Sequence, residues 1–170
     1  RLLWKDTDIT ALPPEKRSVS MLFQDNNLFP HLTVTQNVGL ALSPRLAVSN
    51  KEMVQVEHIL DRVGLTGLGD RKPAALSGGQ QSRAALARGL LQDRDLMLMD
   101  EPFSGLDNRL RDGIRDETLS ILKEEDTAVL LVTHEPYEAM RMADEIALMR
   151  DGKIVQQGAP YNVYTRPLDR

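Results

Sequence analysis

The sequence predicts an α/β protein with a parallel sheet at its centre. Three short apolar runs, each typical of a buried strand, lie far apart in the chain at residues 18–23, 96–99 and 128–132. Several of the segments between them repeat apolar residues at the spacing of amphipathic helices. Strands that alternate with helices favour a parallel sheet, which binds ligands at the carboxyl ends of its strands.

Composition narrows the class of protein. The chain has 170 residues, of which 41% are hydrophobic, enough for one domain or most of one. Its net charge of −4 argues against a nucleic-acid-binding surface, and the absence of cysteine excludes disulfides and thiol chemistry. No apolar run approaches the length of a membrane span, and no signal peptide is visible. Because the sequence begins at Arg1, within an apolar stretch, we expect an N-terminal segment to be missing.

The first elements are a loop-rich edge and a strand. Arg1 to Pro14 combines short apolar stretches with acidic residues and ends in two prolines, which predicts a strand and a loop. Ser18 to Phe23 predicts a short strand with Gln24 at its end. Taken alone, Gln24 is a polar strand terminus.

Residues 25–75 show no strand pattern and are expected to be mostly helical. Thr33 to Leu42 reads as a helix. From Asn50 to Val63 the apolar side chains recur at helical spacing, and Gly64 supplies the stop. His31 is expected to be solvated and without a catalytic role.

The stretch from Leu76 to Gln80 predicts a helix start that can bind an anion. Ser77 can cap a helix that runs to Leu91, and two glycines let a ligand approach the backbone amides closely. Such an N-terminus offers unpaired N–H groups and the positive end of the helix dipole. A plain loop with a helix cap is the alternative for this motif by itself.

Two carboxylates follow the apolar run Leu96–Met99. A parallel strand here would place Asp100 and Glu101 at the ligand-binding edge of the sheet. One carboxylate can hold Mg²⁺, and the other can accept a proton from an attacking water. The alternative is a strand that enters a solvated turn. Ser104 to Asp107 then reads as a polar turn that caps another helix.

The remaining chain predicts further core elements. An amphipathic helix follows Asp107, with apolar residues on one face and with Arg109, Arg111, Asp112, Arg115 and Glu124 on its solvated face. Ala128–Val132 predicts another buried strand, followed by His134. Pro136 fits the first turn of a helix, and Asp151-Gly152 predicts a β-hairpin turn.

These pieces, in this order, resemble the nucleotide-binding subunits of ABC transporters. Leu76–Gln80 is similar to the signature motif, Leu96–Asp100 to Walker B, Glu101 to the catalytic glutamate, Ser104–Asp107 to the D-loop, Phe23-Gln24 to the Q-loop and Thr133-His134 to the H-loop. The resemblance implies a partial ABC ATPase domain over residues 1–170. Its P-loop NTPase-like sheet core would comprise residues 1–24 and 92–170, and residues 25–91 would form an inserted α-helical subdomain.

The resemblance also implies roles for individual residues. It gives catalytic roles to Glu101, His134 and Gln24, and Mg²⁺ ligation to Asp100 and Gln24. It implies nucleotide binding, with ATP and Mg²⁺ as cofactors, by Ser77, Gly78, Gly79, Gln80 and Asp107.

The partners follow from the same resemblance. Two copies of the subunit would sandwich two nucleotides head to tail, and the signature motif of one copy would meet the nucleotide on the other. Permease subunits would bind this homodimer at the cytoplasmic face of the inner membrane, with a substrate-binding protein as an indirect partner. No nucleic acid is expected among the partners.

One part of the family pattern is absent from the sequence. The phosphate-binding pattern G-x-x-x-x-G-K-[ST] does not occur, and Trp4 does not replace the adenine-stacking aromatic. We expect both in the missing N-terminal part, so the 170-residue chain alone is expected not to hydrolyse ATP. The family's C-terminal regulatory domain would have no room here. Gln81 and Ser82 depart from the signature pattern, but Arg83 is retained, so little change is expected.

Within the family, residues 20–40 most resemble the ATPase of thiamine importers. Because other subunits choose the substrate, importers of iron, polyamines or sulfate remain alternatives. A soluble ABC ATPase of DNA repair or translation is a second class, usually marked by coiled-coil insertions or tandem cassettes. A non-catalytic binding module is a third, against which Glu101 and His134 argue.

Overall fold

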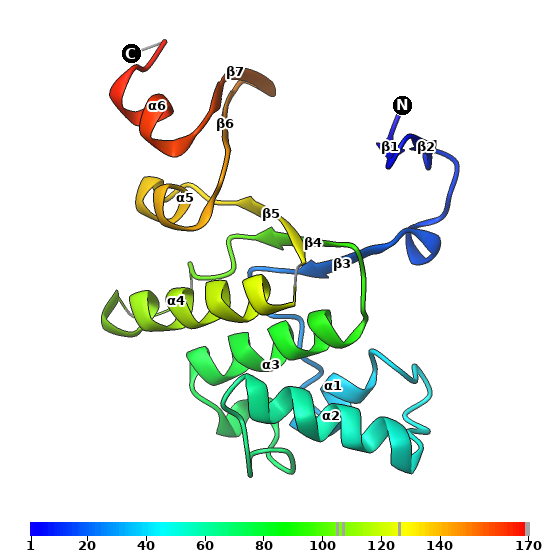
Figure 1. Cartoon of the computed structure of the whole chain (residues 1–170). Coiled ribbons are helices and arrows are strands. Elements are labelled where there is room, and N and C mark those ends of the chain that lie inside the picture. Colours follow the sequence, from blue (N-terminus) through cyan, green and yellow to red (C-terminus); the bar gives the residue numbers. More distant parts are fainter. Residues whose placement is uncertain (105, 107, 126, 169–170) are drawn as a thin grey trace. The chain divides into compact units, whose positions relative to one another are not determined.

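The computed structural model describes residues 1–104, 106, 108–125 and 127–168, with the side chains of residues 108–110 left out. The chain divides into two compact units, residues 1–130 and 131–170, each described by itself below. Among its described residues, the first unit contains a small hairpin, a sheet and four α-helices, and the second begins within the last strand of that sheet (Figure 1).

A short hairpin forms the start of the first unit. Strands β1 (Leu3–Trp4) and β2 (Thr7–Asp8) pair antiparallel, where the sequence predicted one strand and a loop. Lys5 and Asp6 turn the chain with φ angles of 47° and 62°. The hairpin is tied to the sheet through Asp95, which accepts hydrogen bonds from Trp4 Nε1 at 3.3 Å and from Lys5 Nζ at 3.2 Å.

The sheet has the strand order β3-β4-β5, with β3 at Val19–Leu22, β4 at Leu96–Asp100 and β5 at Ala128–Val132. β3 and β4 run parallel, with Val19 opposite Leu96 and Leu22 opposite Met99, so the predicted parallel pairing is confirmed. Alternate residues of the two strands are buried, as a half-covered sheet requires. The buried residues are Ser20, Leu22, Met97 and Met99.

For Ala128–Val132, the predicted strand is confirmed, but its predicted burial is wrong. The strand forms, but Leu130 is 57% exposed and Val132 is 55% exposed. β5 is an outer strand of the described sheet, so it has a neighbouring strand on one side only. An apolar run predicts a strand, but its burial depends on which other elements cover it.

Residues 23–95 contain helices and turns but no strand, as the sequence predicts. In chain order, the elements here are α1 (Val34–Gly39), α2 (Asn50–Arg62), the 3₁₀ turn η2 (Pro73–Ala75) and α3 (Gly78–Leu91). A short 3₁₀ helix, η1 (Pro14–Lys16), precedes β3. Each of the three α-helices begins with a capping box, in which a hydroxyl and a side chain three residues later bond each other's backbone N–H. The pairs are Thr33 with Gln36, Ser49 with Glu52, and Ser77 with Gln80.

Helix α3 is the centre of this unit. It packs against α1, α2, α4 and β3 (Figure 1). Gly89 brings α3 close to the sheet, because a Cβ at this position would lie 3.0 Å from Met97 Cε. The core around these helices is built from aliphatic side chains that are almost completely buried, among them Val34, Val38, Val56, Leu65, Ala84 and Leu86.

Helix α4 (Asn108–Glu124) buries one face, as its apolar spacing predicts. Ile114, Ile121 and Leu122 are buried. The placement of Arg115 on the solvated face is wrong, because its side chain is only 3% exposed and bonds Asp112 Oδ1 at 2.7 Å. An ion pair with an acid one turn earlier lets a charged side chain enter the packed face.

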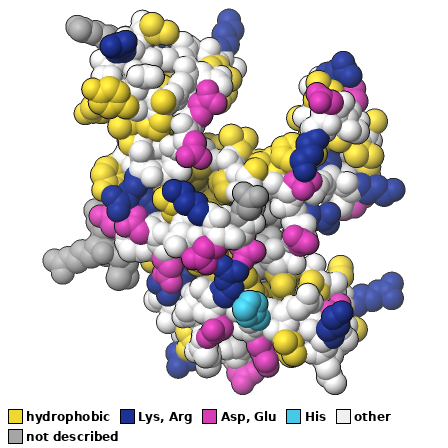
Figure 2. Space-filling model, viewed as in Figure 1, with side chains coloured by type: hydrophobic (Ala, Val, Ile, Leu, Met, Phe, Trp, Pro, Cys, Tyr) yellow, Lys and Arg dark blue, Asp and Glu magenta, His cyan; other side chains and the backbone are white. Residues whose placement is uncertain are grey.

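The second unit contains α5 (Pro136–Met142), the antiparallel pair β6 (Ile146–Arg150) and β7 (Lys153–Gly158), and α6 (Pro160–Thr165). Pro136 begins α5, and Asp151 and Gly152 form the hairpin turn with positive φ angles, so both predictions are confirmed. Hydrophobic side chains lie on the surface of this unit (Figure 2). They include Met149, Ile154, Tyr161 and Tyr164. None of the described helices has both the length and the apolar character of a membrane span.

Candidate functional site

Three of the predicted site residues follow the ends of two paired strands. Leu22 and Met99 are the last register pair of β3 and β4, so both strands end at the same edge of the sheet. Gln24 lies two residues beyond the end of β3, while Asp100 is the last residue of β4 and Glu101 follows it. Gln24 and Asp100 are exposed to solvent, and Glu101 is half-buried. The sheet therefore brings one amide and two carboxylates to a common, accessible edge.

The backbone at Glu101 turns sharply. Glu101 has a φ of 45°, a left-handed conformation that is uncommon for a residue other than glycine. Its carbonyl oxygen accepts hydrogen bonds from Ser104 N at 3.2 Å and from Ser104 Oγ at 2.9 Å. Pro102 and Phe103 are buried directly after it. Strained backbone of this kind persists where the surroundings hold it, and it is enriched at active sites.

The donor atoms at this edge fit Mg²⁺. Mg²⁺ prefers oxygen ligands and is usually held by one or two protein side chains together with phosphates and water. The Asp100 carboxylate and the Gln24 amide oxygen are ligands of this kind at neighbouring strand ends. No group of three or more acidic, histidine or cysteine side chains among the described residues forms an all-protein metal cage. The arrangement therefore fits an ion that is completed by a phosphate ligand.

The predicted helix start at Ser77 is confirmed. Ser77 Oγ accepts a hydrogen bond from Gln80 N at 3.3 Å, and Gln80 Oε1 accepts one from Ser77 N at 3.0 Å. Gly78 and Gly79 occupy the first turn of α3, where backbone N–H groups have no intrahelical partner. Ser77 and Gly78 are exposed, whereas Gly79 is buried against α4. The helix thus presents its N-terminus to solvent and can receive an anion there.

Packing against α4 requires a glycine at position 79. A Cβ on Gly79 would lie 2.4 Å from Ile114 Cδ1, a distance that side-chain atoms do not reach without rearrangement. A Cβ on Gly78 would lie 3.6 Å from Leu106 Cδ2, which is an ordinary contact. The two glycines are therefore not equivalent.

For two further predicted site residues, the position relative to this group stays a prediction. Asp107 lies outside the described residues, as does Gly105, so capping by the turn at 104–107 stays a prediction, although α4 begins directly after it. His134 belongs to the second unit and follows β5. Its side chain is 63% exposed, with Nε2 3.7 Å from Glu135 Oε1. A role for His134 beside Glu101 stays a prediction.

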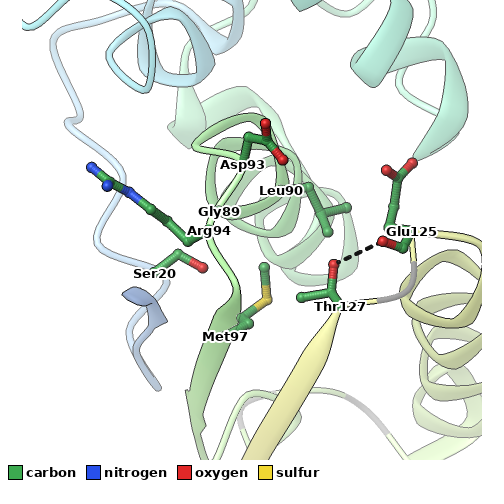
Figure 3. Close-up of a pocket in the computed structure, with 8 residues that line it drawn as sticks. All are labelled: Ser20, Gly89, Leu90, Asp93, Arg94, Met97, Glu125 and Thr127. Atoms are coloured by element: carbon green, nitrogen blue, oxygen red, sulfur yellow. Dashed lines mark hydrogen bonds between the residues drawn. The ribbon is translucent and has the colours of Figure 1, made fainter. Parts of the chain in front are cut away.

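A small hollow lies at the opposite edge of the sheet (Figure 3). It is formed where α3 ends and where β4 and β5 begin, and both acidic and basic side chains line it. Thr127 Oγ1 bonds the backbone oxygen of Glu125 beside it at 3.5 Å. The lining residues are Ser20, Gly89, Leu90, Asp93, Arg94, Met97, Glu125 and Thr127. The hollow shares no residue with the group at Gln24 and Glu101.

The structure also reveals a contact that sequence reasoning missed. Arg88, on α3, donates hydrogen bonds to the backbone oxygens of Asn26 and Asn27, just after Gln24. Burial lowers the pKa of the Arg88 guanidinium. The one signal in the sequence is an arginine among the small and apolar residues of the second half of α3.

Comparison with known proteins gives consistent matches. Residues 1–104 match the family model described as ABC transporter. The chain is 47% identical over 167 residues to the thiamine import ATP-binding protein ThiQ of Ruegeria sp. (strain TM1040), which covers 98% of this chain and 72% of that protein. It is also 47% identical over 153 residues to the protein of the same name from Cereibacter sphaeroides, covering 90% and 66%. The chain thus spans about two thirds of the length of these relatives.

A solved structure shares the fold. The structure of cbiO1 from Clostridium perfringens, described as part of the ABC transporter complex cbiONQ, matches with a TM-score of 0.77 and 28% identity, over 88% of this chain and 60% of that one. This match confirms the predicted α/β fold, with a parallel sheet and a helical region. Together with the match over residues 1–104, it assigns the chain to the ABC transporter family of ATP-binding proteins, a family of ATPases.

Proposed function

We propose that this chain belongs to the ATP-hydrolysing subunit of an ABC importer that takes up thiamine. The observation that carries the ATPase part is the common strand edge that holds Gln24, Asp100 and Glu101. The exposed N-terminus of α3 supplies a second, separate anion-binding surface in the same unit. An acidic pair at a sheet edge and a capped, glycine-rich helix start are two of the parts that phosphoryl transfer to water uses.

The proposed chemistry assigns one task to each group. The Asp100 carboxylate and the Gln24 amide would hold Mg²⁺, which when bound would neutralise charge on the phosphates. Glu101 accepts a proton from the water whose oxygen attacks the γ-phosphorus. The bond between that phosphorus and the bridging oxygen breaks, so ADP leaves with the electron pair and inorganic phosphate forms. His134 would orient Glu101 and the water.

The α3 N-terminus would act on the nucleotide of a second copy of the chain. Ser77 and Gly78 are exposed, so a phosphate of another subunit can reach this helix start. Gln80 supports the site indirectly, since its side chain closes the capping box. The proposed assembly is a homodimer of ATPase subunits, joined by permease subunits at the cytoplasmic face of the membrane and fed by a substrate-binding protein. The proposed subdivision has residues 25–91 as the helical subdomain and residues 1–24 and 92–170 as the core.

Import and thiamine as substrate rest on the names of relatives. The two most similar proteins given above are named thiamine import ATP-binding proteins, and they align with 98% and 90% of this chain. Sequence identity of 47% over nearly the whole chain supports a shared role. It does so indirectly, because membrane and binding-protein subunits contact the substrate.

The test uses the complete protein, co-expressed with its membrane subunits and reconstituted in vesicles. ATP added on the side of this subunit should drive accumulation of labelled thiamine, and a Glu101→Gln complex should not accumulate it. Accumulation of another solute in place of thiamine would refute the substrate. An assembled complex that hydrolyses no ATP would refute the proposed function itself.

A further inference from the structure

The loop that follows Gln24 is held by one side chain from α3. Arg88 donates from Nη1 to the backbone oxygen of Asn27 at 2.8 Å and from Nη2 to that of Asn26 at 3.1 Å. The planar guanidinium therefore fixes two consecutive peptide groups at once, which a flexible ammonium group does less well. These peptide groups lie two and three residues beyond Gln24 in the chain.

The loop has a backbone that needs such support. Asn26 and Asn27 have φ angles of 57° and 46°, so two successive residues other than glycine adopt the left-handed conformation. The chain is wound tightly here, with Asn26 N bonded to Phe23 O at 2.9 Å and Asn27 N to Asp25 O at 2.7 Å. Left-handed residues of this kind persist only where their surroundings hold them. The two Arg88 bonds are a direct restraint of this kind.

Arg88 acts on this loop rather than on an acidic partner. In the part of the chain that the structure describes, both side-chain hydrogen bonds of Arg88 go to backbone oxygens, and Arg88 forms no ion pair. Partial burial disfavours its charge, as the lowered pKa indicates. Loss of the Arg88 side chain would therefore act first on residues 26 and 27.

The same helix, α3, has the exposed Ser77 as its N-cap. Arg88 lies about three turns, or roughly 16 Å, along α3 from this N-terminus. Helix α3 is continuous from Gly78 to Leu91 and packs on four neighbouring elements, so a rigid displacement of the helix would move both of its ends. Movement of α3 at Ser77 would draw the loop at Asn26 with it. Gln24 is the next candidate site residue on that loop.

We propose that Arg88 is a positioning residue that couples the place of Gln24 to the place of α3. The inference rests on the proposed function, because the role of Gln24 at the nucleotide is part of that function. When Ser77 contacts a second subunit and α3 shifts, the bonds from Arg88 would change the position of Gln24, which lies at the strand edge with Asp100. Arg88 itself touches neither nucleotide nor Mg²⁺ in this proposal.

The experiment compares Arg88→Gln with Arg94→Gln in the complete protein. Arg94 is a matched control because it is an exposed arginine just after α3 with no hydrogen bond or ion pair to a described residue. Four quantities are measured: amide hydrogen exchange over residues 24–29 and 84–90, the melting temperature, and kcat and KM for ATP with Mg²⁺. Arg88→Lys is the third variant, because it keeps the positive charge but lacks the planar guanidinium that bonds two peptide oxygens at once.

In Arg88→Gln, exchange over residues 24–29 should become faster, while exchange over residues 84–90 and KM for ATP stay at wild-type values. The kcat should fall by about 10- to 100-fold, the usual effect of a displaced site group. Arg88→Lys should lie between Arg88→Gln and wild type, and Arg94→Gln should match wild type. If Arg88→Gln does not fold, Arg88→Lys carries the same comparison.

A wild-type kcat or unchanged loop exchange in Arg88→Gln would overturn the proposal. Equal acceleration of exchange in both segments would overturn it too, because that result describes general loosening of the fold. Lack of ATP hydrolysis by the wild-type protein would instead refute the proposed function, and the exchange data would still decide whether Arg88 holds the loop.

Discussion

Arg62 and Glu124 form an ion pair of 2.7 Å that joins the last residue of α2 to the last residue of α4. Arg62 also pairs with Glu125 through its other terminal nitrogen. Only 25% of the Arg62 side chain is exposed, so this pair is screened less than one on an open surface. It connects α2 to α4, the helix that packs on the other side of α3.

Replacing Arg62 by Met should lower the free energy of unfolding by roughly 1 kcal/mol, the scale of partly exposed ion pairs. The loss should shrink in about 1 M salt, since salt screens the wild-type pair. Urea unfolding at low and high salt measures both effects. Lys51→Met, an exposed lysine on the same helix, is the control and should leave stability nearly unchanged. An equal loss in both variants would contradict the ion-pair explanation.

Gly79→Ala should destabilise the protein, whereas Gly78→Ala should not. The new methyl group at position 79 would meet Ile114 Cδ1 at 2.4 Å, and crowding of this kind costs about 1–3 kcal/mol. Ile114→Val removes that Cδ1 atom, so the double variant should recover stability relative to Gly79→Ala. Melting temperatures of the single and double variants measure this. A double variant no more stable than Gly79→Ala would show that Ile114 is not the obstacle.

Acid should release the β1–β2 hairpin. Hydrogen bonds from Lys5, and then from Ser18 and Trp4, lower the pKa of Asp95 in the folded protein. Because the folded pKa lies below the unfolded value of about 3.9, this contribution is present above that pH and is lost as pH falls through the folded pKa. Trp4 is the single tryptophan, so its fluorescence reports the hairpin directly.

Asp95→Asn should shift Trp4 emission at neutral pH toward that of the released hairpin, and the difference from wild type should vanish in acid. Asp6→Asn, an exposed acid in the same hairpin turn, is the matched control. A wild-type spectrum for Asp95→Asn at neutral pH would rule out this anchoring role.

Glu101→Gln in the complete protein should keep ATP binding but reduce hydrolysis by about 10²–10⁴-fold, the usual contribution of a positioned base. Gln keeps the size of the side chain but accepts no proton at neutral pH. Binding of a fluorescent ATP analogue and phosphate release are measured separately. Glu15→Gln, an exposed acid distant in sequence, should behave as wild type. Wild-type turnover in Glu101→Gln would remove Glu101 from the role of base.

Ser77→Arg should leave the monomer folded, because Ser77 is exposed, with a loss of about 1 kcal/mol from the helix cap. Hydrolysis should stop, since the bulky side chain blocks the α3 N-terminus. A mixed dimer with Ser77→Arg on one chain and Glu101→Gln on the other collects both changes in one site, so it should retain one intact site. A dimer of a doubly changed chain with a wild-type chain has one change in each site, so it should be inactive. Activity that is independent of this distribution would disprove a site shared between subunits.

Local chemistry made the helix starts and tight turns predictable. A hydroxyl at position 77 with Gln80 three residues later is a capping signal that the sequence carries complete, and Asp151-Gly152 is a turn signal of the same kind. The edge with Gln24 and Asp100 followed from strand ends in a parallel sheet. These features depend on neighbours in sequence or on strand direction alone.

Features set by distant packing were not predictable in this way. Arg115 was expected in solvent because of its charge, yet its pair with Asp112 lets it enter the packed face of α4. Arg88 and Asn26 are 62 positions apart, and no periodicity links them. The crowding of Gly79 by Ile114 likewise depends on how α3 and α4 meet.

The outer strand β5 has a consequence for the behaviour of the chain in concentrated solution. Val129, Leu130 and Val132 are exposed along a strand that has one described neighbour. An uncovered apolar strand edge is a template for a strand from another molecule. The 170-residue chain should therefore self-associate as its concentration rises. Leu130 is 57% exposed, so Leu130→Lys should suppress that association by adding a charge, without disturbing the fold.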